Sequence, residues 1–99
     1  MMLVDSDRPR LAPKVRLRAD RISGKSWLLY PERGLLLDGA GAEIAALCDG
    51  ALTVAELVDY LATRYTDVPQ QEIAQDVAQF LGALAEHGLL ERDARESPL

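Results

Sequence analysis

The stretch Trp27-Leu-Leu-Tyr-Pro-Glu-Arg-Gly-Leu-Leu-Leu-Asp38 predicts a β-hairpin on which the rest of the fold is organised. Two short apolar runs flank Pro31-Glu32-Arg33-Gly34, where proline presets φ for a type I turn and glycine can adopt the positive φ that closes it. The second run, Leu35-Leu36-Leu37, is apolar throughout, so both of its faces should be covered. The cover is either the chain's own helices, a second copy of the protein, or a partner.

The residues before the hairpin predict one further strand. From Lys14 to Asp20 apolar and charged residues alternate, which places Val15, Leu17 and Ala19 on one face of a half-buried strand. A turn at Ser23-Gly24 leads into the hairpin, so the three strands form an antiparallel meander. Residues 1–13 mix charges with two prolines and show no period, which predicts a flexible arm.

Three helices should follow the sheet. Asp38 is a suitable N-cap for a first helix over Gly39–Cys48, and Thr53-Val54-Ala55-Glu56 is a capping box that begins a second helix ending near Arg64 or Tyr65. A third helix spans about Pro69–His87, and Gly88 suits its C′ position. The sequence therefore predicts an α+β, winged-helix-like domain over residues 14–91, with a three-stranded antiparallel sheet followed by three helices. Residues 92–99 should form a frayed tail.

Length and composition favour a single domain in the cytoplasm. The chain has 99 residues, 48% of them hydrophobic, and no apolar run approaches the roughly 20 residues that span a bilayer. A single cysteine excludes an internal disulfide bond. The net charge of -5 is uneven, because residues 1–33 hold eight Lys and Arg against four acidic residues, whereas residues 34–99 hold three against twelve. A basic sheet is therefore expected on an acidic helical body.

Residues that could support catalysis are sparse. His87 is the only histidine, and it lies where a helix end is expected, so it is interpreted as a capping or packing residue. Cys48 stands among apolar residues without a CxxC partner, which is typical of a buried, inert thiol. No phosphate-binding glycine loop or metal motif occurs in the sequence. We therefore expect neither a cofactor nor an enzymatic activity.

A winged-helix shape raises the question of nucleic-acid binding. From Gln70 to Gly88 the third helix contains no Lys or Arg, and it carries Glu72, Asp76 and Glu86. Such a helix cannot neutralise phosphates, from which much of the affinity for DNA arises. We expect no nucleic-acid partner at this helix, and no membrane partner.

Protein or peptide binding is the remaining class. An edge strand at Leu35–Asp38 would present unpaired backbone groups, to which a guest strand can add. On a helical wheel Phe80 and Leu84 of the third helix point to the core, while Asp76, Ala83 and His87 lie on its flank. This side of the helix can therefore form a small apolar shelf beside the edge.

Several motifs resemble the PqqD family, small peptide chaperones of pyrroloquinoline quinone (PQQ) biosynthesis. They are Tyr30-Pro31-Glu32-Arg33-Gly34, Leu37-Asp38, Glu43-Ile44, Cys48-Asp49-Gly50, Thr53-Val54, Asp76-Val77, Phe80-Leu81 and Gly88-Leu89, and the likeness covers about Leu11 to Leu90. The resemblance implies a leader-peptide recognition element that binds the precursor peptide PqqA and presents it to the radical SAM enzyme PqqE. It places the peptide against Leu35, Leu36, Leu37, Asp38, Asp76, Phe80, Ala83 and Leu84.

The chain departs from the family at the start of the first helix. The family commonly has Asn there, followed by Thr and Ala, whereas this chain has Asp38, Ala40 and Gly41. Gly41 lowers helix propensity, so this departure bears on whether the first turn of the helix is ordered. An alternative function is a winged-helix oligomerisation or DNA-binding module, for instance a homodimer formed through the edge strand or by exchange of the hairpin.

Overall fold

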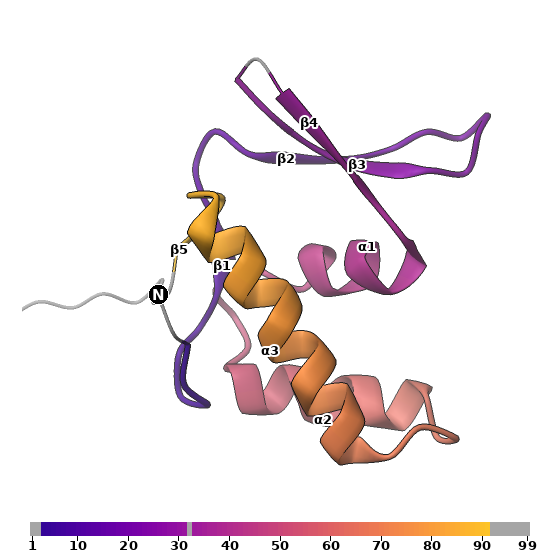
Figure 1. The fold of residues 1–99 in the computed structure, drawn as a ribbon, viewed down its shortest axis with the longest axis vertical. Coiled ribbons are helices and arrows are strands. Elements are labelled where there is room, and N and C mark those ends of the chain that lie inside the picture. The colour runs from indigo at the N-terminus through magenta and orange to yellow at the C-terminus, as the bar shows by residue number, and fades with distance from the viewer. Residues whose placement is uncertain (1–2, 32, 92–99) are drawn as a thin grey trace, which may run out of the picture.

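The computed structural model describes residues 3–31 and 33–91. Within these ranges a three-stranded sheet is followed by three helices, and two short strands join the two ends of the described chain (Figure 1). The predicted α+β class, with its antiparallel meander and three helices, is confirmed. The elements are β1 (Arg10–Leu11), β2 (Arg16–Ala19), β3 (Ser26–Tyr30), β4 (Arg33–Leu37), α1 (Gly39–Ala46), α2 (Val54–Arg64), α3 (Gln70–Glu86) and β5 (Leu90–Glu91).

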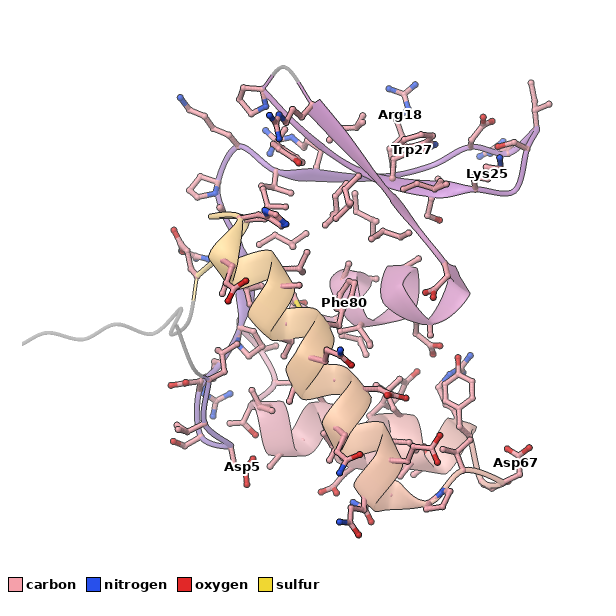
Figure 2. The ribbon with its side chains drawn as sticks, in the orientation of Figure 1. Asp5, Arg18, Lys25, Trp27, Asp67 and Phe80 are labelled. Carbon is pink, nitrogen blue, oxygen red and sulfur yellow. The ribbon has the colours of Figure 1, made fainter. Side chains whose placement is uncertain are left out.

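The sheet has the order β2-β3-β4, which leaves β4 at an edge. Its inner face carries Leu28, which is fully buried and pairs with Leu35 of β4. Its outer face carries Arg18, Trp27 and Leu36 in one row across the three strands. Figure 2 shows Arg18 and Trp27 on the side of the sheet that faces away from the helices.

Leu36 shows that the chain's own helices do not cover both faces of its strand, which was one of the alternatives that the sequence left open. Leu37 is buried against the helices, but Leu36 points to the opposite face and is 49% exposed. Successive side chains of a strand alternate between the two faces, so an apolar sequence does not by itself bury both. Within the described residues, no element covers this outer face (Figure 1).

Gly34 does not close the hairpin turn, contrary to the prediction. Tyr30 pairs with Arg33, so Gly34 already lies inside β4, opposite Leu29, and it is absent from the glycines with positive φ. A Cβ atom at this position would lie 3.3 Å from Leu29 Cδ2 and 3.4 Å from Trp27 Cε3. The glycine therefore makes room for two large side chains on the outer face. Glu32, within the predicted turn, lies outside the described residues.

The helix ends follow the predicted capping residues. Asp38 accepts a hydrogen bond from the Gly41 N–H at 2.6 Å, and α1 begins directly after it, although it ends at Ala46 and is shorter than predicted. The capping box at the start of α2 is confirmed by reciprocal bonds between Thr53 and Glu56. Gly88 follows α3 with a φ of 73°, as predicted for a C′ glycine.

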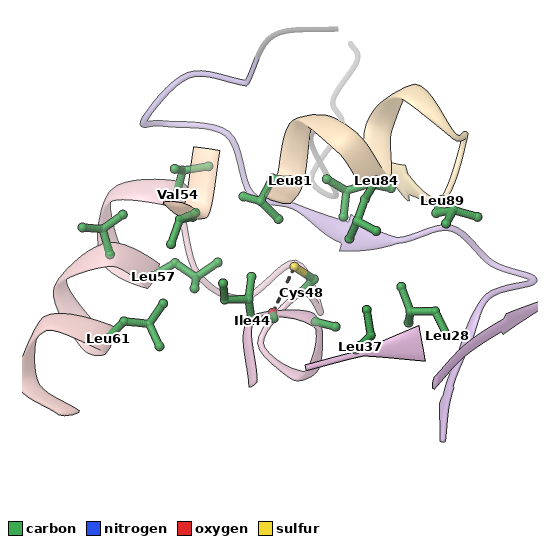
Figure 3. Close-up of a cluster of buried hydrophobic side chains, with 14 of the residues drawn as sticks. Leu28, Leu37, Ile44, Cys48, Val54, Leu57, Leu61, Leu81, Leu84 and Leu89 are labelled. Atoms are coloured by element: carbon green, nitrogen blue, oxygen red, sulfur yellow. Dashed lines mark hydrogen bonds between the residues drawn. The ribbon is translucent and has the colours of Figure 1, made fainter. Parts of the chain in front are cut away.

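The core lies between the sheet and the helices. α1 packs against β2, β3 and β4, and α2 packs against α3. Figure 3 shows the side chains that meet there, among them Leu28 and Leu37 from the sheet and Leu57, Leu81 and Leu84 from the helices. Within the described ranges, none of the helices combines the length and apolar composition that crossing a bilayer requires.

Residues 3–13 differ from the predicted flexible arm. Arg10–Leu11 pairs with Leu90–Glu91, and Pro9 is fully buried. The Pro9 and Asp7 carbonyls accept bonds from the Gly50 and Val54 N–H groups, so this segment is tied to the start of α2. Its long-range backbone partners lie 37 to 81 residues away, and no local sequence pattern indicates them. The predicted frayed tail, residues 92–99, lies outside the described residues.

Candidate functional site

The outer edge of β4 is open in the part of the chain that the structure describes. β3 pairs with one edge of β4, and no described strand pairs with the other. The N-terminal segment does not cover this edge, because β1 pairs with β5 instead. The backbone N–H and C=O groups along the open edge are thus available to another polypeptide.

α3 runs beside this edge, and the two elements enclose a groove of about 270 Å³, here called the edge groove. It is lined by Leu35, Leu36, Leu37, Asp38, Phe80, Ala83, Leu84 and His87. Seven of the eight residues that the sequence singled out therefore meet at one place. Asp76 does not line the edge groove, and it lies one helical turn before Phe80. His87, which was not among the eight predicted residues, also lines the groove and is the C-cap residue of α3.

The groove residues occupy different depths. Leu84 is 1% exposed and forms part of the core beneath the groove. Ala83 is exposed, and its small side chain lines the groove opposite the strand residues. Phe80 is half-buried and extends from α3 towards α1 (Figure 2). The groove thus has an apolar base and a rim that a guest can reach.

Phe80 is positioned by the glycine that departs from the family pattern. Gly41 is buried, and a Cβ atom there would lie 3.1 Å from Phe80 Cε1 and 3.0 Å from Asp38 Oδ1. The missing side chain allows the aromatic ring to lie directly on the first turn of α1. Asp38 caps that turn, which is helical despite its two glycines.

A second hollow, here called the helix pocket, lies between the three helices. Its volume is about 140 Å³, and its lining includes Ala40 and Ile44 from α1, Leu61 and Tyr65 from α2, and Ile73, Asp76 and Val77 from α3. Sequence reasoning missed this pocket. Its residues come from three separate segments, and each fits the ordinary apolar pattern of its own helix.

Hydrogen bonding fixes one wall of the helix pocket. The Tyr65 hydroxyl donates to Glu43 Oε1 at 2.6 Å, and the Arg64 guanidinium forms an ion pair with the same carboxylate. The bond to Glu43 raises the pKa of the Tyr65 phenol, because ionisation would remove the donor and place two negative charges together. The Glu43 charge is balanced by Arg64. Asp76 makes no hydrogen bond or ion pair with the other described residues.

Cys48 is buried, as the sequence predicted, although it lies two residues beyond the end of α1 rather than within the helix. The thiol is buried and donates a hydrogen bond to the Ile44 carbonyl at 3.3 Å (Figure 3). Burial, together with the nearby charge of Asp49, raises its pKa to about 12, so the nucleophilic thiolate is not formed near neutral pH. Over residues 3–31 and 33–91, no three His, Cys, Asp or Glu side chains gather in an arrangement that could hold a metal ion.

Comparison with known sequences finds relatives that match most of this chain. A sequence profile of the family described as Coenzyme PQQ synthesis protein D (PqqD) matches residues 26–90. The PqqA binding protein of Rhodopseudomonas palustris (strain BisB5) is 42% identical over 93 residues, which cover 94% of this chain and 89% of that protein. The bifunctional coenzyme PQQ synthesis protein C/D of Methylorubrum extorquens is 39% identical over 87 residues, which cover 88% of this chain and 23% of that longer protein.

Solved structures share the fold. The solution NMR structure for the PqqD truncation of Methylobacterium extorquens PqqCD, a stand-alone recognition element for ribosomally synthesised and post-translationally modified peptides, matches with a TM-score of 0.77 at 38% identity. The match covers 91% of this chain and 95% of that one. TbiB1 in complex with the TbiA(β) leader peptide matches with a TM-score of 0.71 at 26% identity, covering 83% and 94% of the two chains. By sequence over nearly its whole length and by fold, the chain belongs to the PqqD family.

Proposed function

We propose that this protein is a peptide chaperone of PQQ biosynthesis, which binds the precursor peptide PqqA by strand addition to β4 and presents it to the radical SAM enzyme PqqE. The observation that carries the proposal is the open edge of β4 beside the apolar edge groove. Main-chain hydrogen bonds to the edge would supply affinity, and contacts with Phe80, Ala83 and Leu84 would supply specificity.

The relatives support this choice of guest. Proteins up to 42% identical are named PqqA binding proteins, and the TbiB1 structure, with the same fold, holds a leader peptide. A short guest gains few anchors and must become ordered. We therefore expect a dissociation constant in the micromolar to submicromolar range, which corresponds to a binding free energy of about -8 to -9 kcal/mol. In this proposal the chain itself catalyses no reaction and acts in the cytoplasm, with no nucleic-acid or membrane partner.

Residue-resolved NMR tests the site. Labelled protein is titrated with a synthetic PqqA peptide of Rhodopseudomonas palustris (strain BisB5), and backbone amide shifts are followed. We expect the shifts to concentrate at Leu35–Asp38 and on α3 near Phe80 and Ala83. Shifts confined to β2, on the opposite edge of the sheet, would show that the peptide binds elsewhere.

Presentation to PqqE has a separate test. Purified PqqE is passed over a size-exclusion column with this protein, with and without the PqqA peptide. We expect a ternary complex in which the peptide and PqqE are bound together, because a chaperone that presents its peptide must hold both. Peptide release on addition of PqqE, without a joint complex, would contradict presentation.

The open edge also favours a second candidate function, self-association. An unpaired strand with the half-exposed Leu36 can pair with the same strand of a second copy, directly or by exchange of the hairpin. Light scattering over a range of protein concentrations, with and without peptide, separates the candidates. A dimer that PqqA dissociates would show that both guests compete for β4. A dimer that persists in saturating peptide would place the dimer interface elsewhere.

A further inference from the structure

The edge groove is not the only hollow that a guest lying along α3 would meet. Phe80 lines the edge groove, while Asp76 and Val77, one turn earlier on the same helix, line the helix pocket. On the opposite side, Asp38 lines the groove and Ala40, two residues later, lines the pocket. The ring of Phe80 lies over Gly41 between them. The two hollows are therefore lined by residues on neighbouring turns of α3 and on either side of Gly39 at the start of α1.

The helix pocket is suited to one apolar side chain. Apart from Tyr65 and Asp76, its lining is aliphatic. The base of the pocket is formed by Ile44, Ile73 and Val77, whose side chains are only 1% to 6% exposed. Its volume of about 140 Å³ is close to the roughly 150 Å³ of an apolar protein cavity that binds benzene. The bond from Tyr65 to Glu43 holds one wall in place before any guest arrives.

The charge at the mouth of the helix pocket indicates which type of guest residue lies next to the apolar side chain. Asp76 is exposed and has no partner among the described residues, whereas Glu43 is already paired with Arg64. The sequence from residue 34 onward is acidic, since residues 34–99 hold twelve Asp and Glu against three Lys and Arg. A Lys or Arg in the guest would find its opposite charge here.

Resting on the proposed function, we infer that the helix pocket is a second peptide subsite, which takes one apolar side chain of the guest next to a basic residue that pairs with Asp76. Asp76 and Ala83 lie seven residues apart on α3, about 10 Å along its axis. An extended chain covers that distance in about three residues. The apolar anchor therefore lies about three residues from the guest residue that faces Ala83, on the side of Leu37.

The three isoleucines of the chain make a direct test available. Ile44 and Ile73 line the helix pocket, while Ile22 is 97% exposed in the turn between β2 and β3 and serves as an internal control. Protein with labelled isoleucine methyl groups is titrated with the synthetic PqqA peptide. We expect shifts of the Ile44 and Ile73 methyl signals, with nuclear Overhauser contacts to one apolar peptide side chain, and an unchanged Ile22 signal.

The outcomes distinguish this inference from the proposed function. Amide shifts at Leu35–Asp38 with unchanged Ile44 and Ile73 methyl signals would overturn the second subsite and keep the strand addition. Absence of amide shifts on β4 would overturn the proposed function itself. Shifts at both places, with peptide contacts to the two methyl groups, would support both.

Matched variants provide the affinity measurement. Ala40→Phe fills the pocket from an exposed position, and Ala46→Phe makes the same change at an exposed position of α1 that lines neither hollow. We expect Ala40→Phe to weaken peptide binding at least about tenfold, the lower limit for the loss of one buried apolar side chain, while Ala46→Phe binds like the unchanged protein. Truncating the peptide's anchor to alanine should cost no further affinity in Ala40→Phe. Equal affinities for both variants would overturn the subsite.

Asp76 is tested in the same way. Asp76→Asn should weaken binding about two- to fivefold at low salt and less at high salt, as expected for an exposed ion pair. Glu86→Gln, an exposed change of the same kind at the far end of α3, is the control. A salt-independent effect, or an equal effect of both variants, would contradict a specific pairing of Asp76.

Discussion

Ala83 offers the sharpest test of the edge groove, because it lines the groove and yet is exposed. We consider Ala83→Glu. The fold should tolerate this change, since the new side chain can extend into solvent in the free protein and glutamate is a good helix former. The cost in unfolding free energy should not exceed the roughly 0.7 kcal/mol that separates ordinary residues from alanine in a helix, which lowers the melting temperature by at most about 5 °C.

Peptide binding should respond much more strongly. A guest strand on β4 covers the space beside Ala83, where the carboxylate would lose water without gaining a partner. Burying such a group costs about 1–3 kcal/mol, so the dissociation constant should rise about 5- to 150-fold. Ala83→Lys should weaken binding as well, because the loss comes from volume and desolvation rather than from the sign of the charge.

The control is Ala78→Glu. Ala78 is exposed on the same helix but faces the hollow between α2, α3 and the N-terminal segment. Fluorescence anisotropy of a labelled PqqA peptide measures affinity, and circular dichroism measures the melting temperature. Unchanged affinity in Ala83→Glu would refute binding at the edge groove. A collapse of the melting temperature would show instead that position 83 belongs to the core.

Two stability predictions accompany this one. We expect Gly41→Ala to lower the unfolding free energy by about 1–2 kcal/mol in urea titrations, because its Cβ must displace Phe80 or Asp38. As the control, Gly39→Ala should raise the unfolding free energy by up to about 1 kcal/mol, because its Cβ would meet no atom within 4 Å. A stabilising effect of Gly41→Ala would contradict the packing argument. The buried Cys48 thiol, with its pKa raised from 9.0 to about 12, stays protonated in the folded state while the unfolded thiol ionises, so stability falls as pH rises above 9. At pH 10 the loss relative to pH 7 should be about 1.4 kcal/mol greater in the unchanged protein than in Cys48→Ala, and equal losses would refute the shift.

Local signals in the sequence predicted the elements well. The capping box at Thr53, the N-cap at Asp38 and the C′ glycine at Gly88 all act within four residues, and each was found where predicted. The alternation around Val15 also indicated a strand, although β2 is shorter than predicted and Ala19 is exposed. Such features can be read from sequence because the interacting groups are neighbours in the chain.

The lining of the edge groove is predictable in part. The sequence predicts the residues from β4 and α3 that line it, but it assigns Asp76 to the same place, whereas Asp76 lines the helix pocket. The apolar run at Leu35–Leu37 gave no indication that Leu36 faces away from the core. Helical spacing shows which residues share a face, but it does not show where one hollow ends and the next begins.

By itself, then, the sequence determined the α+β class, the order of the three sheet strands and the three helices, and the capping residues at Asp38, Thr53 and Gly88, because hydrogen bonds between near neighbours and apolar periodicity decide these features. Only the tertiary structure decided that the N-terminal segment pairs with β5 rather than with the edge of β4, that Gly41 accommodates Phe80, and that three helices leave a pocket between them. These features arise from contacts between residues far apart in the chain, as with Arg10 and Glu91, whose pairing joins the two ends of the domain. The sequence of a single segment cannot indicate such a contact, because the contact forms only when distant parts of the chain have packed together.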